Sequence, residues 1–445
     1  MTDLKKLLRI YPGEWRLVLV MGFVLLANAA AEQIAKVVSV SGFLSAGGVN
    51  QVLIIWAVDM ALILFIAILQ SLIIDRFERV TLMQGMIFGL ALLYIVLRLL
   101  FTFHVNERII YAVMLILVDQ QWMFFPLIFW ILANDIFDMA QAKRIFPLIT
   151  IGALLGRILG LGFSFFSPVW FARLGINPEE VLNFNVLIYL LTYILLTWGL
   201  RNVKIRQTQV KPATARETLA EGWGFVRDVP AFRYLTIVTI AVCVTLAINR
   251  FRFMVVTNDT YATRDAYQRF YSLYQLIFIL ISFAVQSLLT SRIIEKGGLK
   301  NTFLIQPLIA FASTVWMIVQ HGIVGTVGGL FIADLGMSTV DDSARKAFMS
   351  IVPEERRGRV SIFLSSYLPA AATILGCLLT GIAILLAPLL EGVGDFYIYL
   401  GISLVFALVT VWASFRVRAV YDTSLFNWRL KRRQRVSSVM DKLDF

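Results

Sequence analysis

The sequence predicts an all-α polytopic membrane protein whose twelve transmembrane helices form two six-helix bundles. The first observation is composition: 59% of the 445 residues are hydrophobic and 15% are charged, with a mean hydropathy of +0.80. In a typical soluble protein, about a quarter of the residues are charged. The second observation is spacing, because the apolar residues gather in blocks of roughly 20 to 28, each long enough to cross about 30 Å of hydrocarbon as a helix. The third is the placement of Lys and Arg.

The apolar blocks fall into two groups. The N-terminal bundle, 1–200, contains predicted spans at 15–44, 50–74, 80–104, 109–133, 145–168 and 181–200. The C-terminal bundle, 232–416, contains predicted spans at 232–256, 270–291, 301–321, 323–340, 360–388 and 394–416. A polar linker, 201–231, separates them and contains a predicted amphipathic helix near 217–225 along the membrane surface. A basic tail, 417–445, follows the last span.

The basic residues test this map independently. Most of the 40 Lys and Arg residues lie in the two termini and in alternate loops, and the opposite loops hold Arg108, Arg173, Arg264 and Arg269. Because cytoplasmic loops carry the Lys and Arg excess, both termini, the linker and the tail are predicted to be cytoplasmic. The net charge of +12 is thus a topology signal, and we expect no nucleic-acid partner. The segment WRLKRRQR (428–435) either attracts anionic lipid or is only a positive-inside anchor.

Charged loops recur at corresponding places in the two halves. IIDRFERVTL follows span two and SRIIEKGGLK follows span eight, while DMAQAKR follows span four and DDSARK follows span ten. Internal similarity of this kind is typical of secondary transporters, and the first loop resembles the Asp-Arg-x-x-Arg turn of the major facilitator superfamily. We expect ion pairs that hold cytoplasmic helix ends together and release during transport. The candidate gating residues are Asp75, Arg76, Arg79, Asp135, Asp138, Lys143, Arg144, Asp342, Arg345 and Lys346.

Several charged residues lie inside predicted spans, where a charge is costly unless it is paired or hydrated. The candidate substrate-binding residues are Lys36, Arg157, Glu32 and Asp119. Two cations facing one cavity suit an anionic substrate, because Arg grips phosphate or carboxylate with two parallel hydrogen bonds. Glu32 lies one turn from Lys36 and either neutralises it in the empty site or forms a structural pair with it.

The remaining charges within spans have other expected roles. Asp59 and Asp334 are candidate proton carriers, and Arg98 lies near the external end, where it can snorkel. Arg250 and Arg252 are expected at an external gate or interface. Three glycines at i, i+4 and i+8, Gly152, Gly156 and Gly160, form a face that permits close helix packing.

Other classes of function lack their sequence signals. The chain has no GxxxxGK[ST] phosphate loop and no polar domain large enough for an ATPase. No arrangement of residues suggests a metal site, a cofactor site or a catalytic nucleophile, so we expect a protein that is not an enzyme. Transport energy must then come from a gradient or from exchange.

One long stretch resembles a known family. The run FWILANDIFDMAQAKRIFPLITIGALLGRILG (129–160) is similar to the FW…AN…AKR-F-PL…G pattern of the ATP/ADP translocase family of plastids and intracellular bacteria. DDSARKAFMSIVPEERRGRV (341–360) is similar to a second loop of that family, and Lys36 fits its first-span lysine, which is implicated in nucleotide recognition. Asp119 is an approximate counterpart of its span-four acid. Where the family has a glutamate in span seven, this chain reads AINRFRF (247–253).

The resemblance implies an ATP-binding nucleotide antiporter in a bacterial inner membrane, closest to the translocase-like domains of bacteria. The leading hypothesis is exchange of a nucleotide or another anionic metabolite by alternating access. A second hypothesis is a membrane platform without transport activity that binds a cytoplasmic protein partner. The third is a proton-coupled major-facilitator symporter with Asp59, Asp119 or Asp334 as the carrier.

Overall fold

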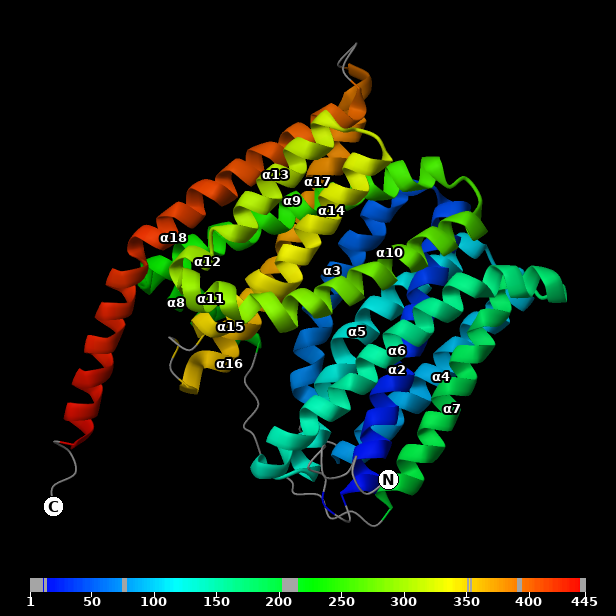
Figure 1. Ribbon diagram of the computed structural model, residues 1–445, viewed down its shortest axis with the longest axis horizontal. Helices are drawn as coiled ribbons and strands as arrows, with labels where there is room; N and C mark the ends of the chain where they lie inside the picture. The colour runs from blue at the N-terminus through cyan, green and yellow to red at the C-terminus, as the bar shows by residue number, and fades with distance from the viewer. Residues whose placement is uncertain are drawn as a thin grey trace. The chain divides into compact units, whose positions relative to one another are not determined.

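The computed structural model describes residues 11, 14–73, 78–201, 215–349, 352, 354–389 and 394–440, and every regular element in these ranges is a helix. Twelve of the described helical segments are long and apolar enough to cross a membrane (Figure 1). The protein is therefore an all-α, multi-pass membrane protein, as the sequence predicts. Asp75 and Arg76 lie outside the described residues, as does most of the linker before residue 215.

The first six spans follow the predicted order. They are α2 (Trp15–Gly47), α3 (Val52–Ile73), α4 (Arg79–Thr102), α5 (Glu107–Ile136), α6 (Met139–Leu174) and α7 (Val181–Leu200). Helix α6 begins a turn and a half before its apolar block because Asp138 caps it. The Asp138 carboxylate accepts from the backbone N–H of Gln141 at 2.8 Å, and the Gln141 side chain accepts from the backbone N–H of Asp138 at 3.0 Å.

The second half contains more helical segments than spans. They are α8 (Ala215–Asp228), α9 (Pro230–Thr260), α10 (Arg264–Val285), α11 (Ser291–Gly297), α12 (Leu299–Thr302), α13 (Ile305–Val319), α14 (Ile323–Gly336), α15 (Asp342–Phe348), α16 (Glu354–Ile362), α17 (Leu368–Leu386) and α18 (Asp395–Met440). One-turn π-helical segments at Gln286–Thr290, Met337–Asp341 and Phe363–Tyr367 join α10 to α11, α14 to α15 and α16 to α17. The ninth and tenth spans are separated by three residues, 320–322, whereas the predicted bounds leave one residue between them.

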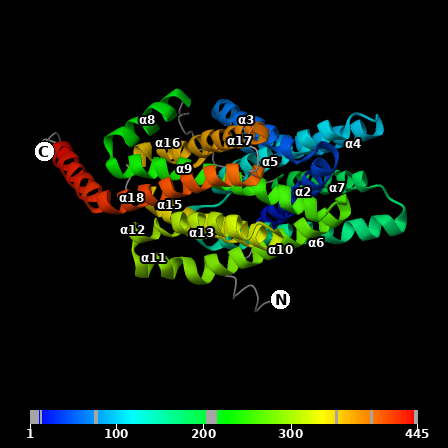
Figure 2. The same cartoon turned by 90° about the horizontal axis from the view of Figure 1, so that it is seen from above.

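Helix α18 continues well past the membrane. Its apolar, membrane-spanning part is Asp395–Thr423, and the helix then runs on to Met440 (Figure 2). The basic segment 428–435 is therefore helical, and its side chains are outside the described residues.

The chain packs into two compact units, and each unit contains segments from both halves of the sequence. Unit 1 contains Met1–Gln51, Leu69–Pro212 and Tyr261–Ile277, and unit 2 contains Val52–Ile68, Ala213–Thr260 and Phe278–Phe445. Most of α3 thus belongs to the same unit as most of the second half of the chain, and the first part of α10 belongs to the same unit as most of the first half. The boundaries at 200 and 232 follow chain order, whereas these units follow side-chain packing.

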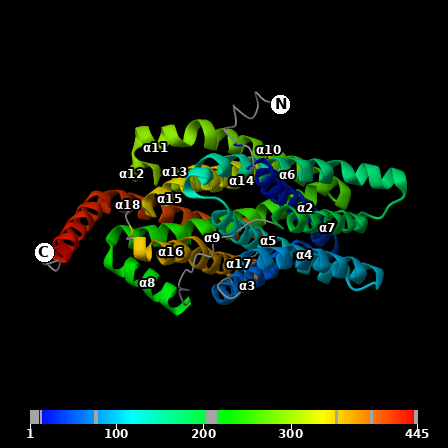
Figure 3. The same ribbon diagram turned by 90° about the horizontal axis from the view of Figure 1, so that it is seen from below.

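Unit 1 is built around α2. Of the most apolar part of α2, 72% is buried, compared with 33% for α4, α5, α6 and α7. Helix α2 packs against α5, α6 and α7, while α4 packs against α5 and α7 (Figure 3).

Unit 2 is built in the same way around α9, which is 78% buried and packs against α13, α14, α17 and α18. Helix α8 also packs against α9, and against α16. It buries Phe225 and Val226 in a cluster that includes Phe232 and Phe363, and it exposes Trp223. The predicted amphipathic helix of the linker is therefore present, with its apolar face on the core of unit 2.

Candidate functional site

The glycine face of α6 brings this helix into backbone contact with α2. A Cβ atom added at Gly152, Gly156 or Gly160 would lie 2.4, 2.1 or 2.5 Å from a backbone carbonyl oxygen of α2. These distances are shorter than any real Cβ contact, so only glycine permits this approach. Arg157 follows Gly156 on α6, and it interacts electrostatically with Glu32 of α2.

Glu32 is the centre of a charged cluster inside unit 1. The Glu32 side chain is 4% exposed, although it lies within a membrane-spanning helix. The residues that interact electrostatically with it are Arg157, Lys36 and Asp119. The Gln33 side chain donates a hydrogen bond to Glu32 Oε1 at 3.3 Å. The structure thus brings together all four residues that the sequence suggests for a substrate site, from α2, α5 and α6.

Two properties of the cluster determine how it can hold an anion. Its two basic and two acidic side chains sum to zero when all are charged, which reduces the cost of burying them. The Nε atom of Arg157 is buried and has no hydrogen-bond partner among the described residues. A buried guanidinium N–H without an acceptor is unfavourable, and a carboxylate or phosphate oxygen would satisfy it.

A neutral hydrogen-bonded network lies deep in the same unit. Gln121 of α5 donates to Asn28 Oδ1 at 3.1 Å and accepts from the Tyr94 hydroxyl at 3.0 Å. The Tyr189 hydroxyl of α7 donates to the same Asn28 oxygen at 3.1 Å, and Asn185 donates to the Ala31 carbonyl at 3.1 Å. These uncharged residues were not predicted as part of the site. The sequence feature that could have indicated this network is the recurrence of Asn and Gln side chains inside apolar spans.

The two candidate proton carriers belong to unit 2. Asp59 of α3 is 1% exposed. Asp334 of α14 accepts from Arg250 of α9 at 2.7 Å, and the Arg250 side chain is 49% exposed. Hydrocarbon does not solvate a guanidinium, so this face of α9 must border polar surroundings.

Arg252, two residues further along α9, has a different environment. Its guanidinium donates to the His321 carbonyl at 2.8 Å and to the Tyr399 hydroxyl at 3.3 Å, and it lies 4.4 Å from the centre of the Phe396 ring. These contacts tie α9 to the turn before α14 and to α18. Arg252 is thus a structural brace within unit 2.

The charged residues predicted at the cytoplasmic helix ends have varied partners. Arg79 lies 3.8 Å from Asp135, and Lys346 lies 2.7 Å from Asp342 on an exposed helix face. Arg345 pairs with Asp341, which was not among the predicted residues, and also donates to Thr239.

On α6 the charged residues differ from the predicted pairing. Asp138 serves as the N-cap, and Lys143 is exposed. Arg144 pairs with Glu14, at the start of α2, at 2.9 Å. Glu14 lies in the N-terminal segment before the first predicted span, and not in one of the charged loops that recur in the two halves.

The first part of α10 is held against unit 1 by polar contacts that the sequence did not suggest. Arg264 pairs with Glu179 at 3.0 Å. One turn later the Gln268 amide donates to the Ser164 carbonyl and to the Ser167 hydroxyl, each at 3.0 Å. Nearby in the same unit, Arg98 pairs with Glu180, which gives this arginine a partner at the end of its span.

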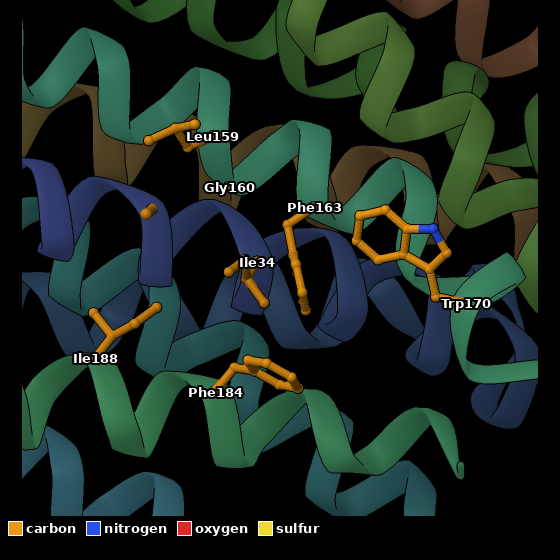
Figure 4. Close-up of a pocket in the computed structure, with 8 residues that line it drawn as sticks. Ile34, Leu159, Gly160, Phe163, Trp170, Phe184 and Ile188 are labelled. Atoms are coloured by element: carbon orange, nitrogen blue, oxygen red, sulfur yellow. The ribbon is translucent and has the colours of Figure 1, made fainter. Parts of the chain in front are cut away.

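Unit 1 also contains an apolar cavity of about 390 Å³ between α2, α6 and α7 (Figure 4). Its lining consists of Ala30, Ile34, Leu159, Gly160, Phe163, Trp170, Phe184 and Ile188. Figure 4 shows Ile34, Phe163 and Phe184 close to one another. With no charged side chain in its lining, this cavity does not suit an anion.

Comparison with known proteins identifies the fold. No family model and no curated protein matches the sequence. Among solved structures, an auto-inhibited peptide transporter of the POT family has a TM-score of 0.62 at 13% identity, over 89% of this chain and 96% of that one. A nucleoside transporter has a TM-score of 0.61 at 13% identity, over 91% and 100%.

A third similar structure, a bacterial homologue of the iron transporter ferroportin in an inward-facing state, has a TM-score of 0.61 at 14% identity, over 90% and 98%. At these identities the similarity shows the fold alone. This chain therefore shares its fold with these solved transporters, and no comparison with known proteins supports the ATP/ADP translocase family.

Proposed function

We propose that this protein is a secondary active transporter that exchanges a phosphorylated or otherwise anionic metabolite by alternating access. The observation that supports it most is the cluster around Glu32, in which two partly buried basic side chains from different helices interact with one buried carboxylate. Lys36 and Arg157 are the proposed anion ligands, and Glu32 and Asp119 balance their charge in the empty site. The transported molecule undergoes no chemical change.

Two further features support this proposal. The fold is shared with transporters of peptides and nucleosides. The resemblance of 129–160 to the ATP/ADP translocase family favours nucleotides as the anions. The Arg250–Asp334 pair and the buried Asp59, all in unit 2, are further charged positions within the spans.

Thermal unfolding of the purified protein tests the site. ATP, ADP and inorganic phosphate are the probe anions. We expect at least one of them to raise the melting temperature of the wild type, and we expect Lys36→Ala and Arg157→Ala each to remove that shift. Loss of one charge-assisted contact, about 1.5–3 kcal/mol, corresponds to binding that is roughly 10- to 100-fold weaker.

Matched variants separate loss of binding from loss of folding. Arg173→Ala removes an exposed arginine from the end of the same helix, α6, and should leave the shift unchanged. Glu32→Gln/Lys36→Ala avoids leaving an uncompensated carboxylate and should still lack the shift. Counterflow in proteoliposomes with the anion that binds then tests exchange. A shift that persists in both single variants would contradict the proposed site.

We also propose a bacterial inner-membrane location with both termini cytoplasmic. The support is the concentration of Lys and Arg in the termini and alternate loops. Reporter fusions at residue 1 and residue 445 should both report the cytoplasm, and opposite sides would contradict the topology. The basic end of α18 is the proposed contact with anionic lipid, and with a cytoplasmic protein where one binds.

A further inference from the structure

The charge of the cluster around Glu32 constrains how it can hold an anion. The ionisable side chains that interact with Glu32 are Lys36 on α2, Asp119 on α5, Arg157 on α6, Tyr189 on α7 and Tyr94 on α4. With tyrosines neutral, the two carboxylates and two cations sum to zero. A bound anion would leave a net negative charge in a region of low dielectric, where uncompensated charge is strongly unfavourable. One proton taken up by a carboxylate would cancel one such charge.

Glu32 is better placed than Asp119 to receive that proton. It is 4% exposed, whereas Asp119 is partly exposed, so the ionised form of Glu32 depends more on its neighbouring cations. Those cations are the two proposed anion ligands. When an anion draws Lys36 and Arg157 toward itself, Glu32 loses the interactions that favour its ionised form.

Gln33 provides a partner for both protonation states of Glu32. Its Nε2 donates to Glu32 Oε1 at 3.3 Å, which suits an ionised carboxylate. Its Oε1 is buried and has no hydrogen-bond donor among the described residues. A protonated carboxyl group has an O–H donor, and rotation of the Gln33 amide would turn this free acceptor toward it. The same amide can therefore accommodate the carboxylate and the carboxylic acid.

We propose that Glu32 takes up one proton when an anion binds at Lys36 and Arg157, so that anion and proton are loaded together. The proton comes from water, adds to one carboxylate oxygen and returns to water when the anion leaves. This inference rests on the proposed anion site and adds a proton as co-substrate. It also gives Glu32, instead of Asp59, Asp119 or Asp334, the proton-carrying role.

The experiment measures protons and anion together on the full-length protein in detergent, with ATP, ADP and inorganic phosphate as probes. We expect the wild type to take up about one proton per anion bound, and its Kd to rise up to tenfold per pH unit above the pH at which Glu32 ionises. In Glu32→Gln, proton uptake and the rise of the Kd with pH should fall to what the ionisation of the probe's own phosphate, with a pKa of about 6, accounts for. Asp119→Asn should retain the uptake.

The outcomes separate the two proposals. Absence of binding by all three probes overturns the anion site and this inference with it. Binding without proton uptake, uptake that survives in Glu32→Gln, or uptake lost only in Asp119→Asn overturns this inference alone. An infrared difference spectrum of the wild type needs no variant. It should gain a carboxylic-acid C=O band when the anion binds, and a missing band would count against protonation of Glu32.

Discussion

Glu14 joins the start of α2 to the first turns of α6. Its carboxylate accepts from Arg144 at 2.9 Å, from Gln141 at 3.0 Å and from the backbone N–H of Tyr11 at 3.0 Å. Burial acts to raise the pKa of Glu14, but these hydrogen bonds and the Arg144 charge outweigh it, so the pKa lies below its ordinary value. The ionised form of Glu14 is therefore favoured in the folded protein.

The sign of this shift predicts how stability depends on pH. Because the pKa is lower in the folded state, the contribution to the free energy of unfolding is complete above the ordinary glutamate pKa of about 4.3, and it is lost as pH falls through the folded pKa. We expect Glu14→Gln to lower the melting temperature near pH 7, and the difference from wild type to shrink below about pH 4. The exposed Glu107→Gln serves as the control. A difference that is constant with pH would contradict the assignment.

Arg157 is predicted to be both a counter-ion of Glu32 and an anion ligand. Arg157→Ala leaves the buried Glu32 carboxylate with one cation fewer, so we expect a loss of stability approaching the roughly 3–5 kcal/mol measured for broken buried pairs. Glu32→Gln/Arg157→Ala should recover most of that loss, and Asp119→Asn/Arg157→Ala should recover less. Melting curves recorded with and without ATP distinguish a structural role of Arg157 from a role in binding the anion. If the recovered double variant also regains its shift with ATP, Arg157 is a brace and not a ligand.

At the residue scale, the sequence indicated which charged residues lie within the spans, but not which residues most of the charged side chains contact. Lys36, Arg157, Glu32 and Asp119 stand out because a charge within an apolar span is rare and costly, and the structure groups them. Asn28, Gln121 and Asn185 were missed because an uncharged amide is tolerated in many membrane helices. The pairing of Arg144 with Glu14 depends on where α2 begins relative to α6, which local sequence does not specify.

At the scale of secondary-structure elements, the site depends on the packing of α6 against α2. A Cβ atom at Gly156 would lie 2.1 Å from the Leu26 carbonyl oxygen, whereas one at Gly162 on the same helix would meet no atom within 4 Å. Gly156→Ala should therefore force the helices apart and cost about 1–3 kcal/mol or more. Gly162→Ala should be neutral or stabilise by up to about 1 kcal/mol. Equal melting temperatures for the two variants would contradict this packing.

Predicted helix boundaries agree with the structure where apolar residues mark the end of a helix. They differ where the helix continues into polar residues. Span six was predicted at 181–200 and α7 is Val181–Leu200. By contrast, α6 starts at Met139 and not at 145, since the capping box of Asp138 and Gln141 adds turns that contain Lys143 and Arg144. The three π-helical turns were not predicted, because one extra residue in a turn leaves no distinct periodicity.

On the scale of the whole molecule, the sequence predicted the number of spans but not how they group. Apolar length specifies a span directly. The grouping of α3 with unit 2 and of the start of α10 with unit 1 depends on side-chain contacts between distant segments. Gln268, for example, reaches Ser164 and Ser167 across more than 100 positions of sequence. Hydropathy contains no information about such partners.

The division of α10 between the units predicts a constraint on transport. Its residues up to Ile277 belong to unit 1 and those from Phe278 onward to unit 2. If exchange requires the start of α10 to separate from α6, a covalent link there should stop it. Gln268 Nε2 lies 3.0 Å from Ser167 Oγ, so the two thiols of Ser167→Cys/Gln268→Cys lie within reach of a short, reducible thiol cross-linker, and the native Cys243 and Cys377 are buried.

We expect the reducible cross-linker to abolish counterflow by this double variant in proteoliposomes, and reduction to restore it. Each single-cysteine variant should be insensitive to the cross-linker. Arg264 and Glu179, whose side chains are 16% and 19% exposed, hold the same segment, so their pair must open in the same step. Undiminished exchange by the fully cross-linked protein would show that the start of α10 and unit 1 move as one body, and the transport step would then lie elsewhere in the chain.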